Sequence, residues 1–107
     1  MRRISATQLA EKLNQENPLL LDVREVWEFE ICHIEGSINI PMGQIPQQLE
    51  QLQQLQTADE TVVICHHVVR SQQVINFLQQ QSDTALTNLD GGVDAWARTI
   101  DPDMPVY

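Results

Sequence analysis

Positive charge is scarce in this sequence: six lysine and arginine residues stand against 15 acidic residues, which gives a net charge of −9. Nucleic acids and anionic membranes are bound through basic surfaces, so this balance argues against both as the main partner. No apolar run approaches the roughly 20 residues of a membrane-spanning helix. We therefore expect a soluble, cytoplasmic protein. Any anion-binding site must be built locally, against the charge of the whole molecule.

Cysteine is also rare. Cys32 and Cys65 could form a disulfide, but two cysteines are few for a disulfide scaffold, and cytosolic thiols stay reduced. Reactivity or packing explains each of them better than a bridge does. The chain has 107 residues, a length that suits one domain over 1–107.

Strand-like and helix-like segments alternate along the chain. Apolar runs predict buried strands at 19–23 and 61–64, and shorter strands are expected at 37–40 and 84–89. The first helix should begin after Ser5, which forms a capping box with Gln8. Further helices are expected at 25–31, at 71–81 and after Gly92, and apolar spacing predicts one glutamine-rich helix between Met42 and Leu55. The alternation predicts an α/β fold with a mainly parallel sheet.

Cys65 has the sequence environment of a reactive thiol. It follows a predicted strand, and a helix starts a few residues later, at the sheet edge where such folds bind ligands. Unpaired N–H groups of the loop, the positive end of the helix and the permanent charge of Arg70 all favour thiolate over thiol. The same loop would stabilise a persulfide anion. The alternative is a buried structural cysteine at a strand end.

Four segments in order resemble one family. They are residues 20–25, Glu28 with 33–41, the loop 65–71, and 89–92 with Trp96. Together they resemble a single-domain rhodanese, or thiosulfate sulfurtransferase. The resemblance implies a three-layer α/β/α domain with a five-stranded, mainly parallel sheet.

The resemblance also implies a reaction. The Cys65 thiolate would take the outer sulfur of thiosulfate or a persulfide donor and pass it to a thiol or cyanide acceptor. Cys65 is then catalytic, no metal or organic cofactor is needed, and any protein acceptor is left open. The implied substrate loop consists of His66, His67, Val68, Val69, Arg70 and Ser71.

Two features of the loop leave alternatives open. Four residues separate Cys65 from Arg70, whereas phosphatases of this fold have five, so phosphatase or arsenate reductase chemistry is a distant third choice. The family usually has glycine where Val68 stands. Either the loop takes another shape, or Val68 is strained, or the site is impaired. The last case would suit a weakly active sulfur-carrier or regulatory binding module, and predicts faster transfer with glycine at position 68.

Several other residues have two interpretations. His66 and His67 could bind the substrate anion or tune the thiolate, or could be exposed loop residues. With Cys32, His33 and Cys65 they could form a metal site, but adjacent residues rarely point at one ion. Cys32 itself could resolve a Cys65 persulfide or pack as a small hydrophobe.

Two further pairs are assigned mainly structural roles. Asp22 and Arg24 could face the site. They are expected mainly in an ion-pair framework with glutamates 25, 28 or 30, which would orient the loops around the site. Trp27 and Trp96 are expected to be packing anchors.

Overall fold

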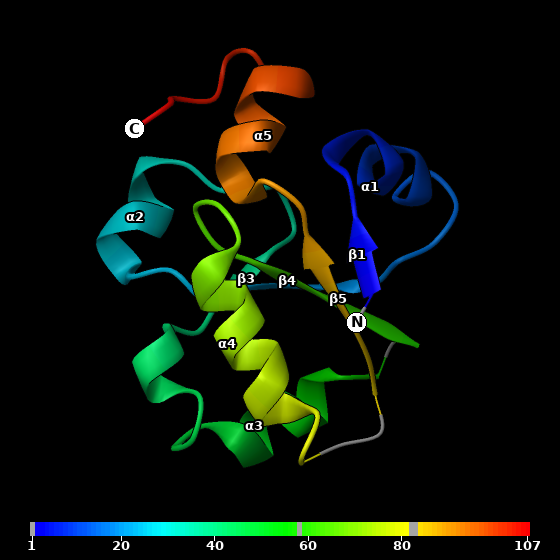
Figure 1. Ribbon diagram of the computed structural model, residues 1–107, viewed down its shortest axis with the longest axis vertical. Coiled ribbons are helices and arrows are strands. Elements are labelled where there is room, and N and C mark those ends of the chain that lie inside the picture. Colours follow the sequence, from blue (N-terminus) through cyan, green and yellow to red (C-terminus); the bar gives the residue numbers. More distant parts are fainter. Residues whose placement is uncertain (1, 58, 82–83) are drawn as a thin grey trace.

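The computed structural model describes residues 2–57, 59–81 and 84–107, and its centre is one parallel sheet (Figure 1). The strands are β1 (Arg2–Ile4), β2 (Leu19–Asp22), β3 (Ile38–Asn39), β4 (Glu60–Ile64) and β5 (Ala85–Leu89). They lie in the order β1-β5-β4-β2-β3, and every pair is parallel. The predicted α/β class and five-stranded sheet are confirmed.

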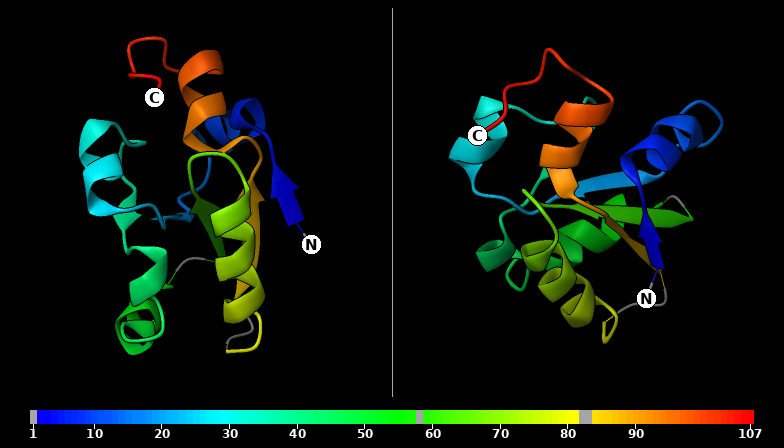
Figure 2. Two further views of the ribbon diagram at one scale, coloured as in Figure 1. Left: turned by 60° about the vertical axis from the view of Figure 1, so that its left-hand side comes forward. Right: turned by 45° about the horizontal axis from the view of Figure 1, so that its top comes forward.

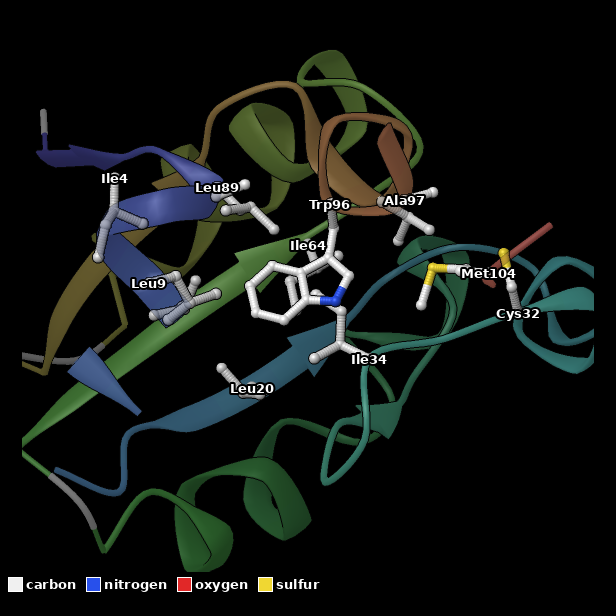
Figure 3. Close-up of a cluster of buried hydrophobic side chains, with 13 residues drawn as sticks. Ile4, Leu9, Leu20, Cys32, Ile34, Ile64, Leu89, Trp96, Ala97 and Met104 are labelled. Carbon is white, nitrogen blue, oxygen red and sulfur yellow. The ribbon is translucent and has the colours of Figure 1, made fainter. Parts of the chain in front are cut away.

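Helices cover both faces of the sheet, as the two views of Figure 2 show. On one face, α1 (Ala6–Lys12) and α5 (Gly92–Thr99) bury a cluster that includes Leu9, Ile64 and Trp96 (Figure 3). On the other face, α3 (Leu49–Leu55), α4 (Val69–Leu78) and the short 3-10 helix η1 (Met42–Gln44) pack against a second cluster. The helix α2 (Val26–Ile31) lies beyond the carboxyl end of β2.

Local sequence signals place several of these elements. Ser5 and Gln8 form the predicted capping box, so α1 begins where the sequence indicates. The strands β2 and β4 match the two apolar runs. The helix α4 begins at Val69, two residues earlier than predicted, which puts Arg70 and Ser71 in its first turn.

Two predictions about secondary structure were wrong. The glutamine-rich helix is divided into η1 and α3, because Pro46 has no N–H group and cannot sit in a helix interior. The strand β1 escaped notice because only Ile4 of its three residues is buried. In the described part of the chain, no helix is long and apolar enough to cross a membrane.

Candidate active site at the Cys65 loop

The candidate catalytic loop, residues 65–70, joins β4 to α4 at the carboxyl edge of the sheet (Figure 1). The start of α5 holds it from behind. The backbone N–H groups of Val93 and Asp94 donate to the carbonyl oxygens of Cys65 and His66, at 2.9 and 3.1 Å. This contact needs a glycine at Gly92, which has φ +57 and lies against the loop carbonyls.

The other side of the loop presents unpaired donors. In a trans peptide the N–H group points opposite to the preceding carbonyl, so the N–H groups of His66 and His67 face away from α5. The backbone N–H groups of residues 66–71 make no hydrogen bond with any residue that the structure describes. Unpaired donors at the start of a helix favour the binding of an anion.

Ser71 connects the nucleophile to the sheet. The Cys65 side chain is buried, and its Sγ lies 3.2 Å from Ser71 Oγ. Ser71 Oγ also lies 2.6 Å from Asn88 Oδ1 on β5 and 3.0 Å from the Val68 carbonyl oxygen. Ser71 has a single hydroxyl proton, so it can stabilise the thiolate only when that proton points at sulfur. Sequence reasoning placed Ser71 in the loop but missed Asn88, because no local pattern links them.

Arg70 is held in a bidentate ion pair. Its Nη1 and Nη2 donate to the two carboxylate oxygens of Glu28, at 2.6 and 2.9 Å. Glu28 is only 4% exposed, and the hydrogen bonds from Arg70 lower its pKa from 4.5 to about 2. The loop arginine therefore reaches the site with its charge already matched by a carboxylate.

Asp22 and Arg24 form a separate, fully buried ion pair. Arg24 Nη2 lies 2.7 Å from Asp22 Oδ2, and the same nitrogen donates to the carbonyl oxygen of Cys32. The structure shows the Asp22–Arg24 ion pair, but the expected pairing of Arg24 with a glutamate carboxylate was wrong. Arg24 reaches only the backbone carbonyl of Glu28, whose carboxylate binds Arg70. The carboxylate of Asp22 satisfies Arg24 within the same strand end, so no glutamate is required.

Tyr107 covers one side of the loop. Its ring stacks on His66 with 4.0 Å between centroids, and its hydroxyl lies 2.8 Å from both Glu28 Oε2 and Arg24 Nη1. Burial chiefly lowers the pKa of His66, and it raises the pKa of Tyr107 to about 12. Sequence reasoning missed Tyr107 because the contact spans most of the chain. His66 is therefore half-buried and covered on one face, and is not a free loop residue.

Val68 does not have the positive φ that favours glycine. It is the residue before α4, with φ −151 and ψ −21, and no described residue other than glycine has positive φ. Of the alternatives at this position, the structure supports a loop whose shape does not need glycine there. Trp96 is buried as predicted, but Trp27 is 60% exposed and touches Tyr107 edge-on, so its assignment as a core anchor was wrong.

Cys32 packs as a small hydrophobe. It is buried beside Met104 (Figure 3), in the cluster beneath α1 and α5, whereas Cys65 belongs to the cluster on the other face. His33 stacks on Phe29. Among residues 2–57, 59–81 and 84–107, no group of three or more histidine, cysteine or acidic side chains could hold a metal ion.

The fold and this loop define a sulfurtransferase-type domain, and comparison with known proteins identifies the family. The rhodanese-like domain matches residues 5–99, so the chain belongs to the rhodanese-like family. The structure of a Staphylococcus saprophyticus protein, SSP1007, is similar, with a TM-score of 0.79 and 32% sequence identity. The match covers 94% of this chain and 97% of SSP1007. Human single-domain sulfurtransferase TSTD1 shares the fold, with a TM-score of 0.77 over 92% of this chain and 97% of TSTD1, at 24% identity.

Longer proteins contain a similar domain. The maize adenylyltransferase and sulfurtransferase MOCS3-1 is 38% identical over 96 residues, which are 86% of this chain and 20% of that protein. The Drosophila grimshawi MOCS3 protein is 34% identical over 99% of this chain and 25% of its own length. The chain thus spans about a fifth to a quarter of the curated relatives it matches.

Proposed function

We propose that this domain, taken as a single unit over 1–107, is a sulfurtransferase that carries sulfane sulfur on Cys65. The thiolate attacks the outer sulfur of thiosulfate or a persulfide and releases sulfite or a thiol. The Cys65 persulfide then gives its outer sulfur to an acceptor thiol. A new S–S bond replaces the old one in each step, so no external oxidant or reductant is needed.

The observation that carries this proposal is the set of unpaired N–H groups around Cys65. Residues 66–71 offer six backbone donors, and Ser71 Oγ touches the sulfur. Because these N–H groups are unpaired, they are available to the negative charge of the outer sulfur once Cys65 carries a persulfide. The loop is one residue shorter than the phosphatase spacing, which favours one sulfur atom over a tetrahedral phosphate.

Intact-mass spectrometry tests the proposal. After treatment with thiosulfate or methanethiosulfonate and removal of the donor, the protein should gain the mass of one sulfur atom. Cys65→Ser should abolish the gain, and the matched variant Cys32→Ser should retain it. Incubation with a thiol should then remove the added sulfur. Absence of any adduct with both donors would contradict the proposal and favour a binding module without transfer chemistry.

A further inference from the structure

Every basic side chain of this protein is paired with a carboxylate. The pairs are Arg2 and Lys12 with Glu60, Arg3 with Asp90, Arg24 with Asp22, Arg70 with Glu28, and Arg98 with Asp94. The exposed pairs are weak in water. The two site pairs are different, because the side chains of Asp22 and Glu28 are 0% and 5% exposed. An anion that reaches Cys65 therefore meets no unmatched arginine or lysine.

Two of the side chains that lie against the loop add no positive charge to it. Burial lowers the pKa of the His66 imidazole, which favours its neutral form, and the Tyr107 phenol has its pKa raised to about 12. Trp27 and Val69, which flank Tyr107 and the loop, are exposed and apolar. These four side chains thus offer hydrogen bonds and apolar contact but no positive charge.

The site can therefore compensate about one negative charge. The N-terminus of α4 supplies the equivalent of roughly half an elementary charge, together with the donors of the loop. The attacking thiolate and the product persulfide each carry one negative charge. Thiosulfate would add two further negative charges. Its sulfonate group would approach a molecule whose net charge is −9, and no unmatched arginine or lysine lies at the site to receive it.

We propose that the physiological donor is a persulfide that brings little negative charge to the site, and that Glu28 sets this preference by neutralising Arg70. This inference rests on the proposed function and names its substrate class. The step is Cys65–S⁻ + R–S–SH → Cys65–S–S⁻ + R–SH. The donor S–S bond breaks, a new S–S bond forms on Cys65, and the proton leaves with the released thiol.

A matched pair of small donors isolates the effect of charge. Thiosulfate and methanethiosulfonate have the same transferable sulfur, but a methyl group in the second replaces one anionic oxygen of the first. The second-order rate constant of persulfide formation on the protein is measured for each donor. It is then divided by the rate constant for the reaction of the same donor with a free small thiol. This reference removes the difference in intrinsic reactivity. We expect the corrected rate with methanethiosulfonate to exceed that with thiosulfate by about tenfold or more.

The variant Glu28→Gln tests the residue assigned to this preference. It frees the charge of Arg70, so the corrected rate with thiosulfate should rise several-fold more than the corrected rate with methanethiosulfonate. The ratio of the methanethiosulfonate rate to the thiosulfate rate should therefore fall. The matched control is Glu50→Gln on α3, an exposed position at the opposite end of α4 from the loop (Figure 2). It removes the same charge from the molecule, and should leave the ratio unchanged.

Salt provides a test that needs no variant. Added potassium chloride screens repulsion, so the wild-type rate with thiosulfate should rise relative to that with methanethiosulfonate. Equal corrected rates in the wild type, a ratio unmoved by Glu28→Gln, or a salt-independent ratio would each overturn the inference while leaving sulfur transfer intact. Failure of both donors to modify Cys65 would instead overturn the proposed function, and the inference with it.

Discussion

Gly92 and Cys65 are in direct backbone contact across 27 positions of sequence: a Cβ atom at Gly92 would overlap the carbonyl oxygen of Cys65. It would also lie 2.6 Å from the carbonyl oxygens of His66 and His67. The glycine on which the loop depends is therefore in the next loop of the sheet edge, and not at position 68.

Gly92→Ala should displace the catalytic loop. The positive φ of Gly92 alone would cost alanine about 1–3 kcal/mol, and the overlap with three carbonyl groups adds to this. We expect a loss of at least 2 kcal/mol in the free energy of unfolding, measured by urea titration, together with loss of sulfur uptake. Gly43→Ala is the matched control, since its Cβ would have no atom within 4 Å. Equal stability of the two variants would contradict this account of the loop.

Ser71→Ala should slow persulfide formation more than it harms the fold. The variant removes the side-chain oxygen that is hydrogen-bonded to Cys65 Sγ and leaves Asn88 Oδ1 without that partner. Loss of a hydrogen bond to a charged group costs about 1.5–3 kcal/mol, which corresponds to a rate lower by roughly 10- to 150-fold. Mass spectrometry of reactions quenched at successive times would give the rate of persulfide formation.

Ser37→Ala is the control for that experiment. It also removes a serine hydroxyl that donates to a backbone carbonyl, that of Ile34, but away from the catalytic loop. Its rate of persulfide formation should match the wild type. An unchanged rate in Ser71→Ala would show that Ser71 only supports the helix start and Asn88.

The sequence predicted those parts of the fold that local patterns determine. Buried runs such as 61–64 are apolar on both faces, so the central strands could be found without partners. The edge strand β1 has one buried residue and gives no such signal. Pro46 divides the glutamine-rich segment, but the apolar spacing on both sides of it is that of one continuous helix.

The residues of the candidate site also fall into two groups: those that local sequence places together and those that only long-range packing brings together. Cys65 through Ser71 are contiguous, so their placement at one sheet edge could be predicted. Glu28 was one of three glutamates expected to join the ion-pair framework of Asp22 and Arg24, yet its carboxylate binds Arg70, at a separation of 42 residues. Tyr107 contacts Glu28 at a separation of 79 residues. Such partners depend on the packing of α2 and the C-terminal segment around the sheet edge, and no single-sequence spacing encodes that packing.

The stability contribution of Glu28 should disappear in acid. Its pKa is about 2 when folded, below the ordinary value of 4.5, because Arg70 donates to the carboxylate. Folding therefore favours the ionised form, so its contribution is present above about pH 4.5 and is lost as pH falls toward 2. Glu28→Gln should be less stable than wild type near pH 7, and the difference in unfolding free energy should shrink between about pH 4.5 and 2. A difference that stays constant over this range would contradict the ion-pair interpretation.

Tyr107 should control the titration of His66 through its ring. Burial is the main cause of the lowered pKa of His66, and the stacked ring of Tyr107 covers one of its faces. Tyr107→Ala should raise the pKa of His66 toward its ordinary value, as measured by NMR of the imidazole protons. Tyr107→Phe keeps the ring and loses only the hydroxyl, so it should leave this pKa nearly unchanged. Equal shifts in both variants would assign the effect to the hydroxyl contacts with Glu28 and Arg24.

Val68→Gly should bring little gain in activity. The sequence predicted faster transfer with glycine, on the premise that this position needs positive φ, but Val68 has φ −151. Its carbonyl oxygen is already held by Ser71 Oγ and Gln72 N–H, at 3.0 and 3.1 Å. Glycine would mainly add freedom to the unfolded chain and destabilise the protein by about 0.5–1 kcal/mol. We expect transfer rates within about threefold of wild type, because a 0.6 kcal/mol change alters a rate by that factor. An increase of tenfold or more would show that Val68 impairs the loop after all.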